Sequence, residues 1–163
     1  MKGATPEPLP QGGQRGYRRA MRYWFVLALV MLASPAAADP LEGLKGEKRP
    51  LLLFSKSRSL SSLDRQVDLL RELRPELEDR DMVVLVTAGS DDTYSAIGYT
   101  SLPRGANRDL RRRFAPQGSG LTVVLVGKDG SEKARFQNVV DPQELFDIID
   151  AMPTRQREMR GEG

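Results

Sequence analysis

Three short apolar runs divide the chain, at residues 51–54, 82–86 and 121–126. Leucine and valine dominate all three, and no regular alternation with polar residues interrupts them, which is typical of strands buried on both faces of a sheet. Residues 134–138 instead alternate in polarity, which is typical of a strand with one face in water. The pattern therefore predicts four strands, of which only the last is a partly exposed edge.

Apolar residues spaced three and four positions apart, together with suitable capping residues, predict helices over 61–81, 108–114 and 142–152. Pro75 falls inside the first of these segments, so we expect that helix to kink or to restart there. Each start has a side chain that can accept a hydrogen bond from the first helical turn. These capping residues are Ser61, with Asp64 as its partner, Asn107 and Asp141.

The predicted elements follow the order β-α-β-α-β-β-α, which is that of an α/β, thioredoxin-like three-layer α/β/α sandwich with a mixed four-stranded sheet. The two β-α units imply right-handed crossovers and parallel pairing. A turn at 127–130 then adds an antiparallel edge strand. Pro153 ends the last helix, and we expect residues 154–163 to form a charged, frayed tail.

An apolar core at 24–33 follows four arginines and precedes Ala36 and Ala38, which fit the small-residue cleavage pattern of a signal peptide. The core has about ten residues, whereas crossing a bilayer takes about 20. We therefore expect cleavage before Asp39 and a periplasmic or secreted protein, with an uncleaved membrane anchor as the alternative. The twin-arginine export route is less favoured, because the residues after Arg18-Arg19 fit that signal poorly.

Residues 1–20 are longer and more polar than the start of an ordinary signal peptide. We interpret them as a disordered extension, because translation from Met21 would leave a leader of normal length at 21–38. Residues 39–153 then form a single domain of a size that buries about two-thirds of its unfolded surface.

The formal net charge of +3 belongs largely to the leader. Removing residues 1–38 leaves 20 of the 25 basic and 21 of the 22 acidic residues, which gives a net charge of −1. Such a domain lacks the basic footprint that nucleic-acid binding needs. We therefore expect no nucleic-acid partner, contact with a membrane only through a retained leader, and a monomer.

The sequence contains no cysteine and no histidine. Disulfides, thiolate nucleophiles and cysteine-ligated metals are therefore excluded, as are Ser-His-Asp hydrolase and histidine-dependent zinc chemistry. Carboxylate, lysine, serine, threonine and tyrosine chemistry remain. No cofactor and no catalytic residue are predicted from the motifs present.

Four segments follow one another in a specific order: 49–54 (RPLLLF), 111–114 (RRRF), 121–130 (LTVVLVGKDG) and 144–153 (ELFDIIDAMP). With them the chain resembles thioredoxin-like proteins and, more specifically, an uncharacterised bacterial family labelled domain of unknown function 4174. That family is similar to segments of secreted animal matrix proteins with sushi repeats and has no established bacterial activity. The resemblance implies a fold and a location rather than a reaction.

The resemblance also defines what this chain lacks. In thioredoxin-like folds the redox cysteines follow the first strand, and residues 55–62 hold that place here without a thiol. The cis-proline expected before the third strand is replaced by Gly120-Leu121. Because both halves of the redox site are missing, the resemblance implies no thiol oxidoreductase or peroxidase activity.

The serine-rich segment 55–62 is the first candidate site, because it joins the carboxyl end of a strand to the start of a helix. Amides at such a helix start can bind an anion. The alternative is a solvated loop with a helix cap. The candidate residues are Lys56, Ser57, Arg58 and Ser59.

Arginines 108, 111 and 112 form the second candidate site, since their spacing places them on one helical face with Arg104 nearby. They could grip a phosphate, a carboxylate or an acidic partner. The alternative is that cations at the end of a helix compensate its dipole.

Residues 90–106 form the longest irregular stretch, in which Tyr94 and Tyr99 could anchor a partner or simply cover the core. Asp91 and Asp92 lack the ligand spacing of a calcium loop, so no metal site is predicted. The sequence thus favours a non-catalytic binding or adaptor module that uses 55–62 and 90–106. Its partner would be an envelope protein or a small anionic ligand, and the alternative is a non-thiol enzyme with serine, tyrosine or carboxylate groups.

Overall fold

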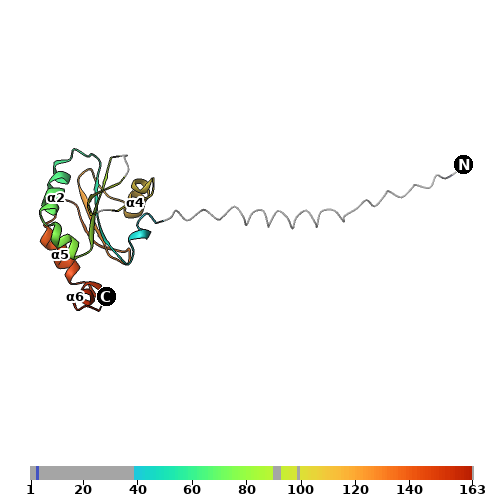
Figure 1. Ribbon diagram of the computed structural model, residues 1–163. Helices are drawn as coiled ribbons and strands as arrows, with labels where there is room; N and C mark the ends of the chain where they lie inside the picture. The colour runs from blue at the N-terminus through green and yellow to red at the C-terminus, as the bar shows by residue number, and fades with distance from the viewer. Residues whose placement is uncertain (1–2, 4–38, 90–92, 99, 163) are drawn as a thin grey trace. The chain divides into compact units, whose positions relative to one another are not determined.

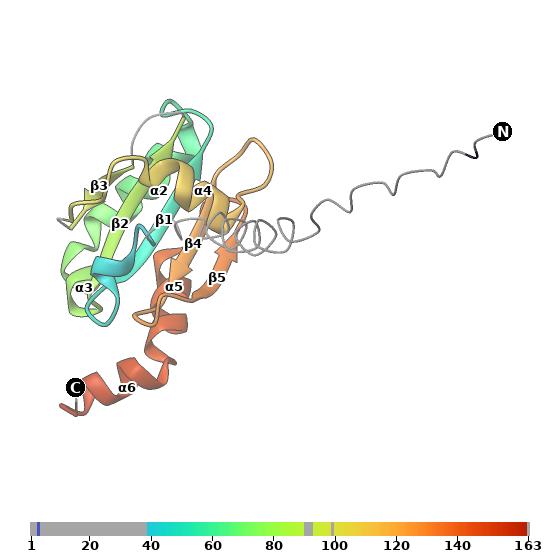
Figure 2. The same ribbon diagram turned by 90° about the vertical axis from the view of Figure 1, so that its right-hand side faces the viewer.

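A computed structural model describes Gly3 and residues 39–89, 93–98 and 100–162 of the protein. The expected leader at 21–38 lies outside the described residues, as does the expected extension at 1–20 apart from Gly3. Residues Ala38–Gly163 form one compact unit. Figure 1 and Figure 2 show how its elements are arranged.

The helices and strands follow one another in a mixed order. They are a 3₁₀ helix η1 (Glu42–Leu44), β1 (Arg49–Ser55), α2 (Ser61–Glu72), α3 (Arg74–Asp79), β2 (Met82–Ala88), β3 (Tyr94–Ile97), α4 (Ala106–Phe114), β4 (Thr122–Val126), β5 (Glu132–Phe136), α5 (Pro142–Asp150) and α6 (Pro153–Met159).

The sheet contains five strands in the order β3-β2-β1-β4-β5, so the prediction of four was one strand short. The additional strand, β3, pairs antiparallel with β2 at one edge. Because β3 reverses the chain, α4 connects two strands that run in the same direction. As a result β4 pairs antiparallel with β1, which corrects the expected parallel pairing, whereas β1 and β2 are parallel as predicted.

Side chains of the central strands alternate between two apolar cores, which explains the unbroken apolar runs in the sequence. In β1, Leu51 and Leu53 face one core, whereas Leu52 and Phe54 face the other. Helices α2, α3 and α5 contribute to the first core, and η1 and α4 contribute to the second. Figure 2 shows α4 in front of the sheet, and the predicted three-layer α/β/α arrangement is confirmed.

The helix starts agree only partly with the predicted caps. Asp141 caps α5 as predicted, because its side chain accepts a hydrogen bond from the Gln143 amide. Helix α2 instead begins after Leu60, and α4 begins after Gly105 in a left-handed conformation, both without a side-chain cap. Pro75 lies in the first turn of α3, so the expected restart of the helix is observed.

The expected frayed tail contains helix α6, which ion pairs attach to the domain. Arg155 is buried and donates to the backbone oxygen of Asp79 at 2.7 Å. Glu158 pairs with the buried Arg49 of β1. Tertiary contacts therefore order a segment whose local sequence is charged throughout.

None of the helices in the described ranges is long and apolar enough to cross a membrane.

Candidate functional site

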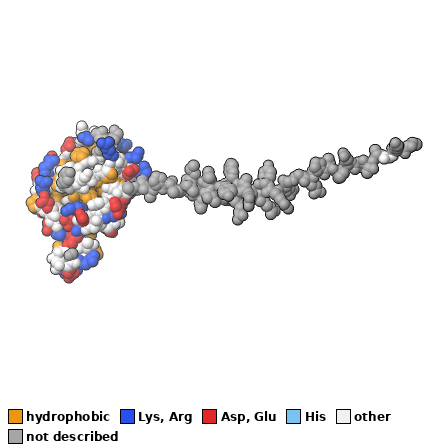
Figure 3. All heavy atoms as spheres, turned by 45° about the vertical axis from the view of Figure 1, so that its right-hand side comes forward, with side chains coloured by type: hydrophobic (Ala, Val, Ile, Leu, Met, Phe, Trp, Pro, Cys, Tyr) orange, Lys and Arg blue, Asp and Glu red, His pale blue; other side chains and the backbone are white. Residues whose placement is uncertain are grey.

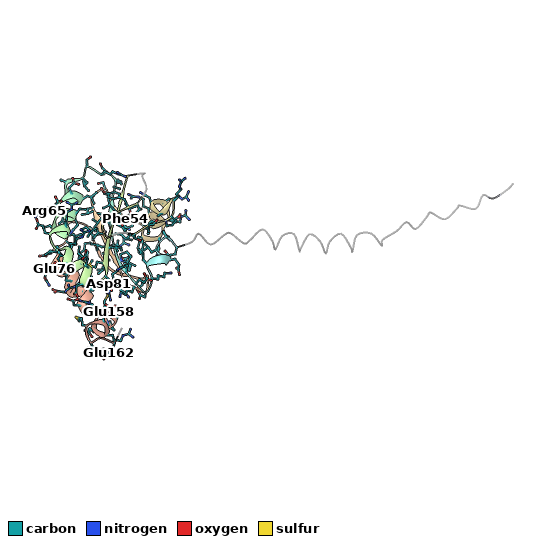
Figure 4. All side chains as sticks on the ribbon, viewed as in Figure 1. Phe54, Arg65, Glu76, Asp81, Glu158 and Glu162 are labelled. Atoms are coloured by element: carbon teal, nitrogen blue, oxygen red, sulfur yellow. The ribbon has the colours of Figure 1, made fainter. Side chains whose placement is uncertain are left out.

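The carboxyl ends of β1 and β2 lie side by side, because the two strands are parallel and Ser55 is in register with Ala88. Phe54 lies near this end of the sheet, whereas Asp81 and Glu158 lie toward the other end (Figure 4). The serine-rich segment leaves β1 at this point. The predicted loop and the end of β2 are thus brought together by parallel pairing.

The serines of this segment bond mainly to the local backbone. The Ser55 hydroxyl donates to the Ser57 carbonyl at 2.6 Å, and it accepts from the Ser57 amide at 3.2 Å. The Ser57 hydroxyl in turn accepts from the Ser59 amide at 3.2 Å. These bonds hold a tight turn and leave the segment close to β1.

Arg111 of α4 reaches across the ends of both parallel strands. Its Nη2 donates to the backbone oxygens of Ser55 at 2.5 Å and Thr87 at 2.8 Å. Its Nε donates to the side-chain oxygen of Asn107, one turn earlier in α4, at 3.0 Å. Three acceptors from three elements therefore fix this guanidinium at the sheet edge.

The acceptors that hold Arg111 are all neutral. Burial lowers the pKa of Arg111 below its ordinary value of 12.5, and the guanidinium also lies 5.9 Å from the centre of the Phe54 ring. No carboxylate of the described residues forms an ion pair with it. A positive charge is thus placed where the fold family carries its cysteines, without a described counter-charge.

Arg111 and Lys56 line one small pocket, with a volume of about 30 Å³. The mouth is formed by the segment that precedes β4, where Gln117, Gly118 and Gly120 are exposed. Thr122, the first residue of β4, lies on the opposite wall. We call this cavity the Arg111 pocket.

Arg58 does not line the Arg111 pocket but lies over Tyr94, with its guanidinium carbon 5.2 Å from the ring centre. This contact joins the serine-rich segment to β3, and 41% of Tyr94 is exposed. Below Tyr94 a groove of about 430 Å³ runs between α2 and β3. The groove has apolar walls from Leu63, Val67 and Ala96, with acidic residues of α2 at its rim.

The remaining predicted site residues are separated from both cavities. Arg108 and Arg112 lie on the exposed side of α4 and pair with Asp109, at 3.6 Å and 3.3 Å. Charged side chains of both signs are interspersed over the face of the domain in Figure 3. Tyr99 and the aspartates 91 and 92 lie outside the described residues. The structure therefore separates Arg111 from the two arginines with which its spacing had grouped it.

Sequence reasoning missed two of the groups that position Arg111. Asn107 was interpreted as a helix cap, yet it lies within α4 and holds the arginine. Its spacing of four residues from Arg111 was the available signal. Thr87 contributes through its backbone, so no side-chain pattern could have identified it.

The peptide bonds around the site agree with the expected departure from thioredoxin. No cis peptide bond occurs in the part of the chain that the structure describes. Gly120 and Leu121 precede β4, at the place where a cis-proline was expected. Thus neither a cysteine nor a cis-proline contributes to this edge of the sheet.

Comparison with protein families gives a match over most of the domain. Residues 40–158 match the sequence profile of the family described as Domain of unknown function (DUF4174). Sushi repeat-containing protein SRPX of Homo sapiens is 32% identical over 115 residues, which cover 69% of this chain and 25% of the human protein. The rat protein is 31% identical over the same length. The chain thus spans about a quarter of these relatives.

Solved structures with a similar fold include two Plasmodium proteins. Reduced 2-Cys peroxiredoxin of Plasmodium vivax has a TM-score of 0.54 and 16% identity, with 74% of this chain and 72% of that chain covered. Thioredoxin peroxidase I of Plasmodium yoelii has a TM-score of 0.52 and 16% identity, with 76% and 82% covered. At this identity the likeness concerns the fold alone, and it confirms the predicted thioredoxin-like class.

Proposed function

The chain belongs to the family described as Domain of unknown function (DUF4174), and we propose that it acts as a non-catalytic binding module on a thioredoxin-like fold without cysteine. One observation carries the proposal: Arg58 lies over the exposed Tyr94 ring, at 5.2 Å. This contact combines the two segments that the sequence favoured for binding into one surface. We call it the Arg58–Tyr94 surface, and it includes the adjacent groove between α2 and β3.

The composition of this surface supports a role in binding proteins. Tyrosine and arginine are enriched among the residues that dominate interface energies, because each offers a large contact area with a polar group. Tyr94 and Met159 are the large apolar side chains with high exposure among the described residues, at 41% and 55%. Tyr94 differs from Met159 because it adjoins a groove with apolar walls.

The two edges of the sheet differ in a way that favours β3 as a binding edge. Strand β5 carries Glu132, Lys133 and Arg135, and charges of this kind discourage pairing with another strand. Strand β3, with the sequence Tyr-Ser-Ala-Ile, carries none. The Ser95 hydroxyl is also buried without a hydrogen-bond partner in the described part of the chain. We propose that an extended segment of a partner protein pairs with β3.

The serine-rich segment supports binding rather than catalysis. An activated serine needs a base within hydrogen-bond distance, yet the Ser55 and Ser57 hydroxyls bond to backbone groups. No carboxylate or lysine of the described residues bonds to either hydroxyl. The alternative, a non-thiol enzyme at this position, therefore has no observation in its favour.

We also propose that the domain is exported. The apolar core at 24–33 and the small residues Ala36 and Ala38 support this proposal. Sequencing the amino terminus of the protein recovered from its host tests it, and a start at Asp39 is expected. A mature protein that begins at Met1 or Met21 would contradict cleavage.

Affinity capture tests the binding function directly. The tagged full chain is expressed in its own host as wild type, Tyr94→Ala and Met159→Ala. We expect wild type and Met159→Ala to retain the same partner, and Tyr94→Ala to lose about tenfold or more of it, as is typical of a central aromatic anchor. Equal recovery with Tyr94→Ala would overturn the proposal.

A further inference from the structure

The Arg111 pocket has unused hydrogen-bond donors. A guanidinium carries five N–H groups, one on Nε and two on each terminal nitrogen. In Arg111, Nε donates to Asn107, and Nη2 donates to the backbone oxygens of Ser55 and Thr87. Nη1 makes no hydrogen bond within the described residues. Two donors on a fixed, half-buried cation are therefore available on the side that these acceptors leave open.

The charge of the pocket is also uncompensated. Two carbonyl oxygens and one amide oxygen surround the guanidinium, and none of them carries a negative charge. Lys56 lines the same pocket and forms no ion pair with any described residue. Two cations around one concave space attract an anion, because their fields add and the protein wall screens them less than water does.

The other arginines of α4 show that this state is specific to the pocket. Arg108 and Arg112 lie in solvent, and both pair with Asp109. Arg113 pairs with Asp39. These arginines thus have carboxylate partners, whereas Arg111 points toward the sheet and has none among the described residues.

The size of the pocket limits the ligand. Its volume of about 30 Å³ exceeds the roughly 10–15 Å³ that one water needs. It is too small for a nucleotide or a sugar phosphate. We propose that the Arg111 pocket binds a small monovalent anion, either a halide or a single carboxylate group, through Nη1 of Arg111 with help from Lys56. This inference does not depend on the Arg58–Tyr94 surface, from which Arg111 is separate.

Nuclear magnetic resonance titration of the ¹⁵N-labelled full chain tests the proposal. Sodium chloride and sodium formate are the two probes that fit the pocket, and sodium sulfate at matched ionic strength is the oversized one. We expect chloride, formate or both to shift the Arg111 Nε–H signal and the Gly118 and Gly120 amides in a saturable manner. We expect sulfate to produce no saturable shift. A chloride-only response assigns a halide site, and a formate response extends the ligand class to carboxylates.

Two charge-matched variants separate the pocket from general electrostatics. Lys56→Gln removes an exposed cation that lines the pocket, and it should weaken anion binding by about threefold to fivefold. Arg112→Gln removes the same charge from the outer side of α4, and it should leave binding unchanged. Arg111→Lys should abolish saturation, because an ammonium cannot satisfy three acceptors and also bind an anion with two fixed donors.

Three results would overturn the proposal. One is a linear, unsaturable response of the pocket signals to both chloride and formate. Another is equal weakening by Lys56→Gln and Arg112→Gln, which would mean that only net charge matters. The third is unchanged binding in a folded Arg111→Lys protein, since the anion would then bind elsewhere.

Discussion

Arg49 and Glu158, which lie 109 residues apart in the chain, form an ion pair in which Nη2 of the arginine donates to both carboxylate oxygens, at 2.9 and 3.0 Å. The Arg49 side chain is 1% exposed and that of Glu158 is 18% exposed. The pair connects the start of β1 to α6, which is why the charged end of the chain is ordered. Lys128 joins the same carboxylate at 2.7 Å.

Replacing Glu158 by glutamine should destabilise the fold by about 3 kcal/mol, because removing one partner of a buried pair leaves the other charge uncompensated. Urea unfolding of wild type and variant measures this change. Glu162→Gln is the matched control, since Glu162 pairs with the exposed Arg160 and such pairs contribute about 0–1 kcal/mol. Equal losses in the two variants would contradict the importance of the buried pair.

Acid should weaken the same end of the domain. Burial raises the pKa of Glu158, but hydrogen bonds from Arg49 and Lys128 lower it further, so the pKa lies below its ordinary 4.5. For Asp81, burial likewise raises the pKa, while bonds from Lys128 and Lys48 bring it below 3.8. A carboxylate with a lowered pKa contributes its full stabilisation above the unfolded pKa and loses it as the pH falls through the folded pKa.

The free energy of unfolding should therefore hold steady down to about pH 5 and decrease at lower pH. Urea titrations at successive pH values between 3 and 7 measure it. The decrease should be shallower in Glu158→Gln, which has no carboxyl group to protonate at this position. Parallel profiles for the variant and the wild type would contradict this assignment.

Between about pH 5.5 and 8 the stability should change by less than about 0.5 kcal/mol, because no side chain has an ordinary pKa in that range when histidine and cysteine are absent. The same urea titration, extended to pH 8, checks this. A marked change within the range would reveal a carboxyl or lysine with a strongly shifted pKa. Such a group would be the sign of catalytic tuning that the binding proposal excludes.

The buried Gln66 of α2 should be the most sensitive polar position in the first core. Its amide donates to the Val140 carbonyl at 3.1 Å and accepts from the Val140 amide at 2.8 Å. Gln66→Leu would leave both backbone groups unpaired, at an expected loss of about 3 kcal/mol. The exposed Gln143 is the control, and Gln143→Ala should cost less than about 1 kcal/mol. Similar urea midpoints for the two variants would contradict the prediction.

The sequence predicted the elements whose stability is mainly local or apolar. The runs that became β1, β2 and β4 were clear, because a strand buried on both faces must be apolar at every position. Strand β3 was missed, since Tyr94–Ile97 is short and mixes polar with apolar side chains. Helix α6 was missed for a similar reason, because ion pairs with Arg49, Asp79 and Asp150 hold it.

The candidate site followed the same division. The location after β1 could be predicted from the order of elements, and Lys56 was among the residues named. The arginines at 108, 111 and 112 could not be separated, because spacing on a helix does not reveal which face meets the sheet. The contact of Arg58 with Tyr94 depends on β3, and so it required the three-dimensional structure.

Site-specific photo-crosslinking tests the central claim, that the domain works by binding a partner at the Arg58–Tyr94 surface. A photoreactive phenylalanine analogue replaces Tyr94 in one variant and Met159, the other highly exposed apolar residue, in the second. After irradiation in the native host, we predict a discrete covalent adduct from position 94 and none from position 159. Absence of an adduct at position 94, or the same adducts from both positions, would contradict the account.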